Sequence, residues 1–408
     1  MKHRIVLTMI VKNEEHVIER ALNSCYKMID SYCIVDTGST DKTKEVIKNF
    51  FDSKGIEGKI VDFEFTNYEE CRNKSIEFGK ELGEYGFWMD ADEELILDKT
   101  FSKQIFKTFL KGNKFPDQLV IDVHYGALKY HRAQFFKFSS DWYWYGPVHE
   151  VLTKNKEGST QMQFPFGYHK VHPDGNSWQT DDLSKKYQDH AEILLQYQND
   201  NEWKDARWTF YLAQSYKDAA NIRLSTDPKD ELGITLVKKA IQYFTERVAD
   251  KTGFHQEIYY SQLMIARLQY HLSSDDLILN QLLKCEELNA DNRVEHLFNI
   301  ASFLQAQSYH KSALMYLKLG LKYIKEGTTS ALFLEPMCYE WALYDMYGVS
   351  LYFTGDLDGS LKYFKYTLKK INNGNATNID IERVENNVKS AENAIQQRNH
   401  TPRQKIRI

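Results

Sequence analysis

The sequence predicts an α/β protein in two parts: a mostly parallel sheet with an antiparallel extension in residues 1–180, then an all-α region of helical repeats in residues 181–395. Two observations predict this division. Short apolar runs alternate with amphipathic segments in the first part, which is the β-α order of a parallel sheet with right-handed crossovers. Beyond HPDGNS, a cluster of turn formers at 172–177, the segments have helical periodicity. A chain of 408 residues also exceeds the usual size of one core.

The first part contains four apolar runs that we interpret as parallel strands. The first of them, RIVLTMIV, is apolar apart from Arg4 and Thr8, as expected of a strand that is buried on both faces. The residues after it form a helical stripe of Val17, Ile18, Ala21, Leu22 and Cys25. The four predicted strands span residues 4–11, 32–36, 59–65 and 85–90, with a helix after each of the first three.

From residue 115 to residue 170 the pattern changes to paired strands. The segments DQLVIDVHYG, KYHRAQFFKF and QMQFPFGYH are apolar enough for strands, and SSDWYWYGPVHE lies between the second and the third. We expect them to form an antiparallel extension that closes over the edge where the parallel strands end.

The helical part contains a weak repeat. AIQYF at residue 240, ALMYL at 313 and SLKYF at 360 share a small residue, an aliphatic residue, a spacer, a tyrosine and an apolar residue. Spacings of this size fit helix-hairpin repeats with one divergent copy and loop insertions, and an irregular helical bundle is the alternative. The basic segment 396–408 is expected to be a frayed tail.

Composition narrows the function classes. With 27% charged residues and a net charge of −5, the chain has no basic excess of the kind that nucleic-acid binding requires. The 5 cysteines lack CxxC spacing and are expected to be reduced and buried. The N-terminal apolar stretch is shorter than a membrane span and has no cleavage site, so we expect a cytoplasmic protein without a membrane span.

Acidic residues follow two of the predicted strands. Asp36 ends the second strand, and Asp90 and Asp92 lie at the end of the fourth, in the stretch GFWMDADEEL. Ligands of open parallel sheets bind beyond the carboxyl ends of the strands, so these acids are expected at one edge. Two aspartates separated by one residue suit a Mg²⁺ or Mn²⁺ ion that bridges a diphosphate. A solvated turn is the alternative for such acids.

Several other site types are excluded or left open by spacing. VKNEEH after the first strand has no glycine for a dinucleotide, and no GxxxxGK[ST] occurs. The HExxH zinc motif fails because Thr153 stands where the second histidine belongs. His169 and His172 are more often structural, but either could complete a metal site rich in aspartate.

Six ordered motifs together resemble the family 2 glycosyltransferases with the GT-A nucleotide-diphospho-sugar transferase fold. They are IVKNEE, IVDTGSTDKT, CRNKS, WMDADEE, YGPVHE and VHPDG, and they cover about the first 180 residues. The helical remainder is similar to the tetratricopeptide-like region of a subgroup that includes bacterial peptide S-glycosyltransferases.

The resemblance implies an inverting transfer from a nucleotide-sugar donor, usually a UDP-sugar, and assigns roles to residues. Asp36 would contact uracil. Asp92 would bind the metal directly, while Asp90 would bind it through water or contact the ribose. His172 aligns best with a further metal ligand, although HPDGNS departs from the subgroup pattern and leaves His169 open. The remaining nucleotide-binding positions are Val11, Asn13, Glu14 and Arg72.

The catalytic assignment completes the interpretation. Glu150, after the GPVH turn, is the candidate base, and His149 would position the sugar or a phosphate. The helical repeats would present a protein, peptide or glycan acceptor, or form a homodimer. The alternatives are an inactive scaffold, against which Asp36, Asp90 and Asp92 argue, and a nucleotidyltransferase, which normally has the glycine-rich loop that is missing here.

Overall fold

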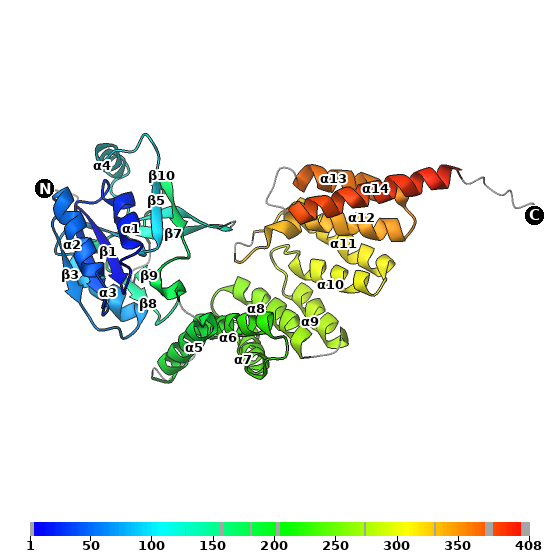
Figure 1. Cartoon of the computed structure of the whole chain (residues 1–408), viewed down its shortest axis with the longest axis horizontal. Helices are drawn as coiled ribbons and strands as arrows, with labels where there is room; N and C mark the ends of the chain where they lie inside the picture. The colour runs from blue at the N-terminus through cyan, green and yellow to red at the C-terminus, as the bar shows by residue number, and fades with distance from the viewer. Residues whose placement is uncertain are drawn as a thin grey trace, which may run out of the picture. The chain divides into compact units, whose positions relative to one another are not determined.

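The computed structural model describes residues 4–126, 128–154, 158–179, 182–200, 205–272, 275–329, 332–371 and 378–400. The chain divides into two compact units, Met1–Trp203 and Lys204–Ile408. Figure 1 labels their helices and strands in chain order.

The first unit combines a large sheet with helices. Its strands are β1 (Ile5–Val11), β2 (Ser31–Asp36), β3 (Gly58–Asp62), β4 (Tyr85–Trp88), β5 (Glu93–Leu97), β6 (Gln118–Tyr125), β7 (Leu128–Lys137), β8 (Trp142–Tyr145), β9 (Val151–Lys154) and β10 (Gln161–Val171). Its helices are α1 (Ile18–Cys25), α2 (Thr43–Lys54), α3 (Tyr68–Gly79), α4 (Lys103–Gly112) and α5 (Leu183–Asp200).

The large sheet has the order β3-β2-β1-β4-β7-β6-β10-β5. β1 pairs in parallel with β2 and with β4, and β2 pairs in parallel with β3, which confirms the parallel part of the prediction. β3 and β4 end earlier than the sequence predicted, at Asp62 and Trp88. Because β1 pairs in parallel with both β2 and β4, Asp36 at the end of β2 and the aspartates after β4 lie at the same edge of the sheet.

The extension of the sheet is mixed, whereas the sequence predicted antiparallel pairing. β7 pairs antiparallel with β4 and β6, but β10 pairs in parallel with β6. The reason is that β8 and β9, which come between β7 and β10 in the sequence, form a separate antiparallel pair. The chain therefore crosses over before β10 joins the sheet. β5, which the sequence analysis missed, pairs antiparallel with β10.

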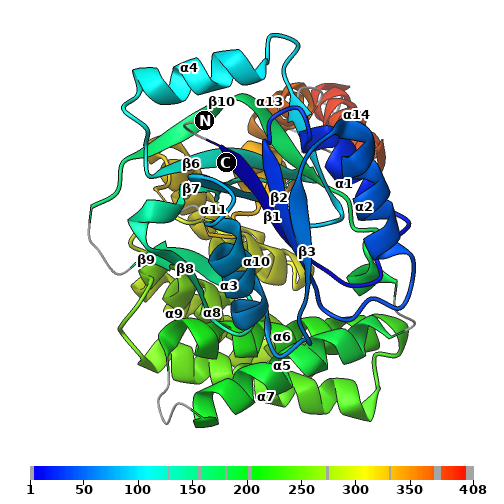
Figure 2. The ribbon, with the colours of Figure 1, turned by 90° about the vertical axis from the view of Figure 1, so that its left-hand side faces the viewer.

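Helices cover both faces of the parallel strands. Figure 2 shows α1 and α2 on one side of β1–β3 and α3 on the other. The larger apolar core includes Ile18, Leu22 and Phe51 from the first pair of helices. A smaller core on the α3 side joins Trp88 to Trp144 of β8.

The second unit is helical in its described residues, and consecutive helices pack against one another along the chain. Its α-helices are α6 (Ala206–Thr226), α7 (Glu231–Ala249), α8 (His255–Leu268), α9 (Asp275–Glu287), α10 (Glu295–Ala306), α11 (His310–Glu326), α12 (Leu343–Phe353), α13 (Leu357–Ile371) and α14 (Asn378–His400).

The weak sequence repeat lies in α7, α11 and α13, at equivalent buried positions. The small residue and the last apolar residue are buried in each copy because they are four residues apart on one helix face. These pairs are Ala240 with Phe244, Ala313 with Leu317, and Ser360 with Phe364. The residues that recur in the predicted repeat are thus ones that pack in the interior of the helical unit.

Three further expectations concern the whole chain. All five cysteines are free and buried, as predicted. None of the helices in the described ranges combines the length and the apolar character that crossing a bilayer requires. Residues 396–400 of the predicted tail lie in α14, and residues 401–408 are outside the described residues.

Candidate active site

A cavity of about 580 Å³ opens where the parallel strands of the first unit end. It lies among the β1–α1 loop, the turn after β4, the β8–β9 hairpin, the segment after β10 and α5. Its predicted site residues are Val11, Glu14, Arg72, Asp90, Asp92, His149 and Glu150. The cavity also contains residues that the sequence analysis did not name, including Thr37, Glu93, Tyr125, Tyr130, Arg132, Trp178, Lys186 and His190.

Asp90 and Asp92 lie in a tight turn between β4 and β5. The Asp90 N–H donates to Glu93 Oε2 at 3.1 Å, and the Glu93 N–H donates to the Asp90 carbonyl at 3.2 Å. Burial raises the pKa of Asp92 to about 7, and the nearby carboxylates of Asp90, Glu93 and Glu14 add to the rise. A divalent cation at this position would offset that crowding of negative charge.

Glu93 is a buried acid that sequence reasoning missed. Its carboxylate accepts from Arg132, and its Oε2 lies 3.4 Å from His169 Nδ1. Burial acts to raise the pKa of Glu93, but Arg132 and His169 hold it below its ordinary value. Because its backbone and side chain both bond to Asp90, Glu93 fixes the turn that carries the two aspartates.

Arg72, on α3, joins two parts of the site. Its Nη2 donates to Asp90 Oδ1 at 2.7 Å, and its Nε donates to Glu150 Oε1 at 2.5 Å. The guanidinium also lies 5.0 Å from the ring centre of Trp88 and 4.9 Å from that of Trp144. Its guanidinium is therefore paired with two carboxylates of the protein, and its expected position beside the nucleotide stays a prediction.

The β8–β9 hairpin brings His149 and Glu150 to the cavity. Asn73, next to Arg72, holds β8 through the Trp144 backbone. His149 has φ 55°, a left-handed conformation that costs a side-chain-bearing residue on the order of 1 kcal/mol. This backbone geometry aims the hairpin turn at the cavity.

Asp36 is almost fully buried at the end of β2. Its Oδ1 accepts from the N–H groups of Gly38 and Ser39, at 3.0 and 2.8 Å. Its Oδ2 is buried and has no hydrogen-bond partner among the described residues. An unpaired buried carboxylate oxygen of this kind suits an N–H or O–H of a ligand.

Asn13 and Glu14, after β1, mainly hold neighbouring loops. Asn13 Oδ1 accepts from the Thr40 N–H at 2.8 Å, and so ties the β1–α1 loop to the β2–α2 loop. Both carboxylate oxygens of Glu14 accept from the Asn176 N–H, at 3.2 and 3.1 Å. Burial raises the pKa of Glu14.

The segment after β10 packs closely on Asp92. The His172 N–H donates to the Asp92 carbonyl at 3.0 Å. Gly175 lies so close that a Cβ on it would stand 3.0 Å from Asp92 Cβ. Arg20 of α1 anchors the segment through two bonds to Asp174, at 2.7 and 2.6 Å.

The two candidate histidines have different surroundings. His169 is fully buried, its Nδ1 lies 3.2 Å from Gln134 Nε2, and burial lowers its pKa. His172 is partly exposed, and its Nε2 lies 3.0 Å from Glu94 Oε2. Within the described ranges, no three His, Cys, Asp or Glu side chains form a cluster that could hold a metal. The predicted set of Asp90, Asp92 and His172 is thus not assembled, since Arg72 and Glu94 pair with two of its members.

α5 contributes a lysine and a histidine to the cavity. Lys186 Nζ lies 4.1 Å from the ring centre of Trp178. Burial lowers the pKa of His190 to about 4, and its Nδ1 has no hydrogen-bond partner in the part of the chain that the structure describes. The His190 ring lies edge-on to those of Tyr68 and His149, at 6.2 and 6.0 Å.

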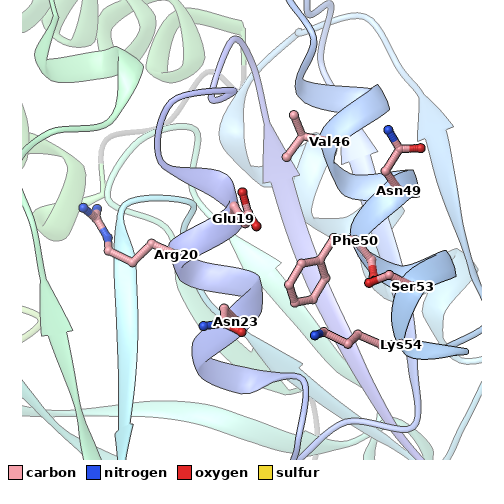
Figure 3. Close-up of a pocket in the computed structure, with 8 residues that line it drawn as sticks. All are labelled: Glu19, Arg20, Asn23, Val46, Asn49, Phe50, Ser53 and Lys54. Carbon is pink, nitrogen blue, oxygen red and sulfur yellow. The ribbon is translucent and has the colours of Figure 1, made fainter.

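A second hollow, of about 620 Å³, lies between α1 and α2 (Figure 3). It shares no lining residue with the first cavity and contains none of the predicted site residues. Figure 3 shows Arg20 pointing away from the other labelled side chains, in keeping with its bonds to Asp174. The lining residues are Glu19, Arg20, Asn23, Val46, Asn49, Phe50, Ser53 and Lys54.

The fold and the acidic strand ends agree with a family comparison. Residues 7–170 match the model of Glycosyl transferase family 2. The first unit of this chain therefore contains a family 2 glycosyltransferase domain with a GT-A fold. No curated protein matches the chain.

Three solved structures also show weak similarity to the chain. TarS 1–349 from S. aureus aligns with a TM-score of 0.36 and 15% identity over 70% of this chain and 90% of that one. The same fragment in complex with UDP-GlcNAc aligns with a TM-score of 0.36 and 14% identity, over 70% of this chain and 91% of that one. BtubC from P. vanneervenii aligns with a TM-score of 0.42 and 14% identity, over 52% of this chain and 83% of that one. None of these similarities is strong enough to indicate function.

Proposed function

We propose that this protein is a metal-dependent inverting glycosyltransferase that uses a nucleotide-sugar donor, with a UDP-sugar as the expected class. The observation that carries the proposal is Asp92 at the strand-end edge, with its pKa raised to about 7. Among the described residues, no cationic side chain pairs with this carboxylate. A Mn²⁺ or Mg²⁺ ion there would supply the missing positive charge and neutralise the departing diphosphate.

The nucleoside would lie toward β1 and β2. Val11 and Thr37 line that end of the cavity, and Asp36, whose buried Oδ2 has no partner among the described residues, directly precedes Thr37 in the chain. A carboxylate oxygen there can accept from the N–H of a uracil ring or from a ribose hydroxyl. Asp36 therefore supports the expected nucleoside contact.

The transfer requires a base on the opposite side of the donor sugar. Glu150 lines the cavity, and Arg72 holds one of its oxygens. In the proposed step the acceptor nucleophile attacks the anomeric carbon, its proton moves to Glu150, and the bond from that carbon to the phosphate oxygen breaks. The bonding electrons leave with the diphosphate. His149, in the same turn, would position the sugar or the phosphate.

The helical unit is the proposed site for a protein, peptide or glycan acceptor, or for a homodimer contact. Stacked helical pairs form extended surfaces of the kind that suits such ligands. Composition and the five unpaired cysteines support a cytoplasmic setting.

The test is a thermal-shift panel of UDP, GDP, CDP and UDP-sugars, each with Mn²⁺, Mg²⁺ or a chelator. A ligand that binds only the folded chain must raise its apparent stability. We expect a shift with uridine nucleotides that requires the cation, together with slow release of UDP from one donor sugar. Glu150→Gln should retain the shift and lose that release. The absence of any nucleotide shift with saturating Mn²⁺ would contradict the proposal and favour an inactive scaffold.

A further inference from the structure

We infer that Lys186 of α5 is the protein cation that binds the diphosphate of the donor, so that a helix beyond the family 2 match completes the donor site. This inference rests on the glycosyltransferase function proposed above. The family match ends at residue 170, and α5 begins at Leu183. The contact is thus one that the matched residues alone cannot supply.

The first step is the charge of the cavity. Five carboxylates line it, from Glu14, Asp90, Asp92, Glu93 and Glu150. A donor diphosphate adds further negative charge, which requires cations that are not already paired.

The buried guanidiniums in the lining are committed to the protein. Arg72 bonds to Asp90 and Glu150, and Arg132 bonds to Glu93. Moving Arg132 to a phosphate would leave the buried Glu93 carboxylate without its partner, which is costly. Moving Arg72 would unpair two partly buried carboxylates at once. The two lysines of the lining, Lys12 and Lys186, remain.

Lys186 is the better placed of the two lysines. Its Nζ has a single long bond, to Ser177 Oγ at 3.4 Å, and no carboxylate ion pair among the described residues. An ammonium group carries three N–H donors, so Lys186 has donors available for phosphate oxygens. Its Nζ lies over the ring of Trp178 and the residue is half-buried, whereas Lys12 is exposed.

Lys186 also lies on the side of the cavity where the acids gather. Lys186 and Asp92 line the same cavity; burial lowers the pKa of Lys186, and the negative charge of Asp92 acts against this and favours the charged ammonium. A diphosphate bound between a cation on Asp92 and the ammonium of Lys186 would be neutralised from both sides. That arrangement stabilises the leaving group as its charge develops.

The experiment compares binding of UDP, uridine and inorganic pyrophosphate by calorimetry, with Mn²⁺ present, in the chain of 408 residues. The variants are Lys186→Ala and Lys186→Arg. Lys185→Ala is the matched control, because Lys185 is the preceding residue of α5 and is exposed, where it pairs with Asp189. Thermal unfolding of each variant without ligand reports on folding.

We expect Lys186→Ala to weaken UDP and pyrophosphate binding about tenfold to a hundredfold, the usual effect of one charged hydrogen bond. Uridine binding should be unchanged, Lys186→Arg should restore part of the loss, and Lys185→Ala should match the wild type. Unchanged UDP affinity in Lys186→Ala, or an equal loss for uridine, would overturn this role of Lys186 and leave the proposed function standing. A wild-type chain that binds none of the three probes would overturn both.

Discussion

Asn73 and Trp144 are joined by two hydrogen bonds that imitate the pairing of strands. Asn73 Nδ2 donates to the Trp144 carbonyl at 2.9 Å, and the Trp144 N–H donates to Asn73 Oδ1 at 2.8 Å. One amide side chain on α3 thereby places β8, and with it the turn that leads to Glu150.

Asn73→Ala should lower both stability and activity. The substitution leaves the Trp144 N–H and carbonyl without these partners, at a cost of about 1 to 3 kcal/mol in the free energy of unfolding. The rate of sugar transfer should also fall, and by more than the loss of folded protein explains, because the hairpin that carries Glu150 loses its bonds to Asn73. Urea unfolding and initial rates measure the two effects. Asn113→Ala is the control, since it removes a side-chain bond to Phe109 at the end of α4. Equal activity in both variants would contradict the positioning role.

Asp92→Asn should make the chain more stable at high pH when a chelator is present. The folded chain keeps the Asp92 proton up to a pKa of about 7, while the unfolded chain releases it near the ordinary value of 3.8. The unfolded chain therefore binds fewer protons in that interval, and wild-type stability falls as the pH rises through it.

The difference in unfolding free energy between Asp92→Asn and the wild type should be near zero at pH 4. It should grow to about 1 to 3 kcal/mol by pH 8, after allowance for solvent screening. Added Mn²⁺ should stabilise the wild type alone, and more strongly above pH 7, because the ligand must be deprotonated. Urea unfolding along a pH series measures this difference. A difference in unfolding free energy that does not change with pH would refute the raised pKa of Asp92 as its cause.

Glu93→Gln should destabilise the fold strongly. Removal of this charge leaves the partly buried Arg132 without its carboxylate, and breaking a buried pair costs about 3 to 5 kcal/mol. Since the carboxylate form is stabilised in the fold, the stabilisation is present near neutral pH and is lost on acidification. Denaturant unfolding at pH 7 measures the loss. The double variant Glu93→Gln with Arg132→Met should recover part of it, and no recovery would argue against a charge effect.

Gly175→Ala should impair cation binding without unfolding the protein. The new methyl group would stand 3.0 Å from Asp92 Cβ and 3.2 Å from Asp92 Oδ2, so the carboxylate must shift. We expect Mn²⁺ affinity to fall about tenfold, as calorimetry would show. Gly112→Ala is the matched control, because a Cβ there meets no atom within 4 Å. Similar Mn²⁺ affinity in the two variants would contradict the steric argument.

The positions of the acidic residues were predictable because parallel strands end at a shared edge. Val11 is level with Asp36, and Thr8 is level with Trp88, so the chain beyond β2 and β4 must emerge together. Their roles in binding remain predictions. The partner of Asp90 was not predictable, because Arg72 reaches it from another element and reaches Glu150 through tertiary packing.

Glu93 and β5 show where sequence patterns give too little information. Two acids in succession after a turn are typical of solvent exposure, yet Glu93 is buried because Arg132 arrives from β7 to neutralise it. The short strand β5 begins with these two acids, which are not typical of a strand, so the sequence pattern did not indicate it. In α5, helical periodicity identified the helix but could not show that its Lys186 lies in the cavity of the first unit.

The boundary between the two compact units lies after Trp203, so α5 belongs with the sheet and not with the helical region assigned to residues 181–395. Tyr197 of α5 also donates to Glu69 Oε2 of α3 at 3.3 Å. Recombination that exchanged everything beyond residue 180 would separate α5 from the sheet, whereas a junction after residue 203 would keep them together. Chimaeras and evolutionary shuffling of the helical region should therefore preserve donor recognition only when α5 is inherited with the transferase.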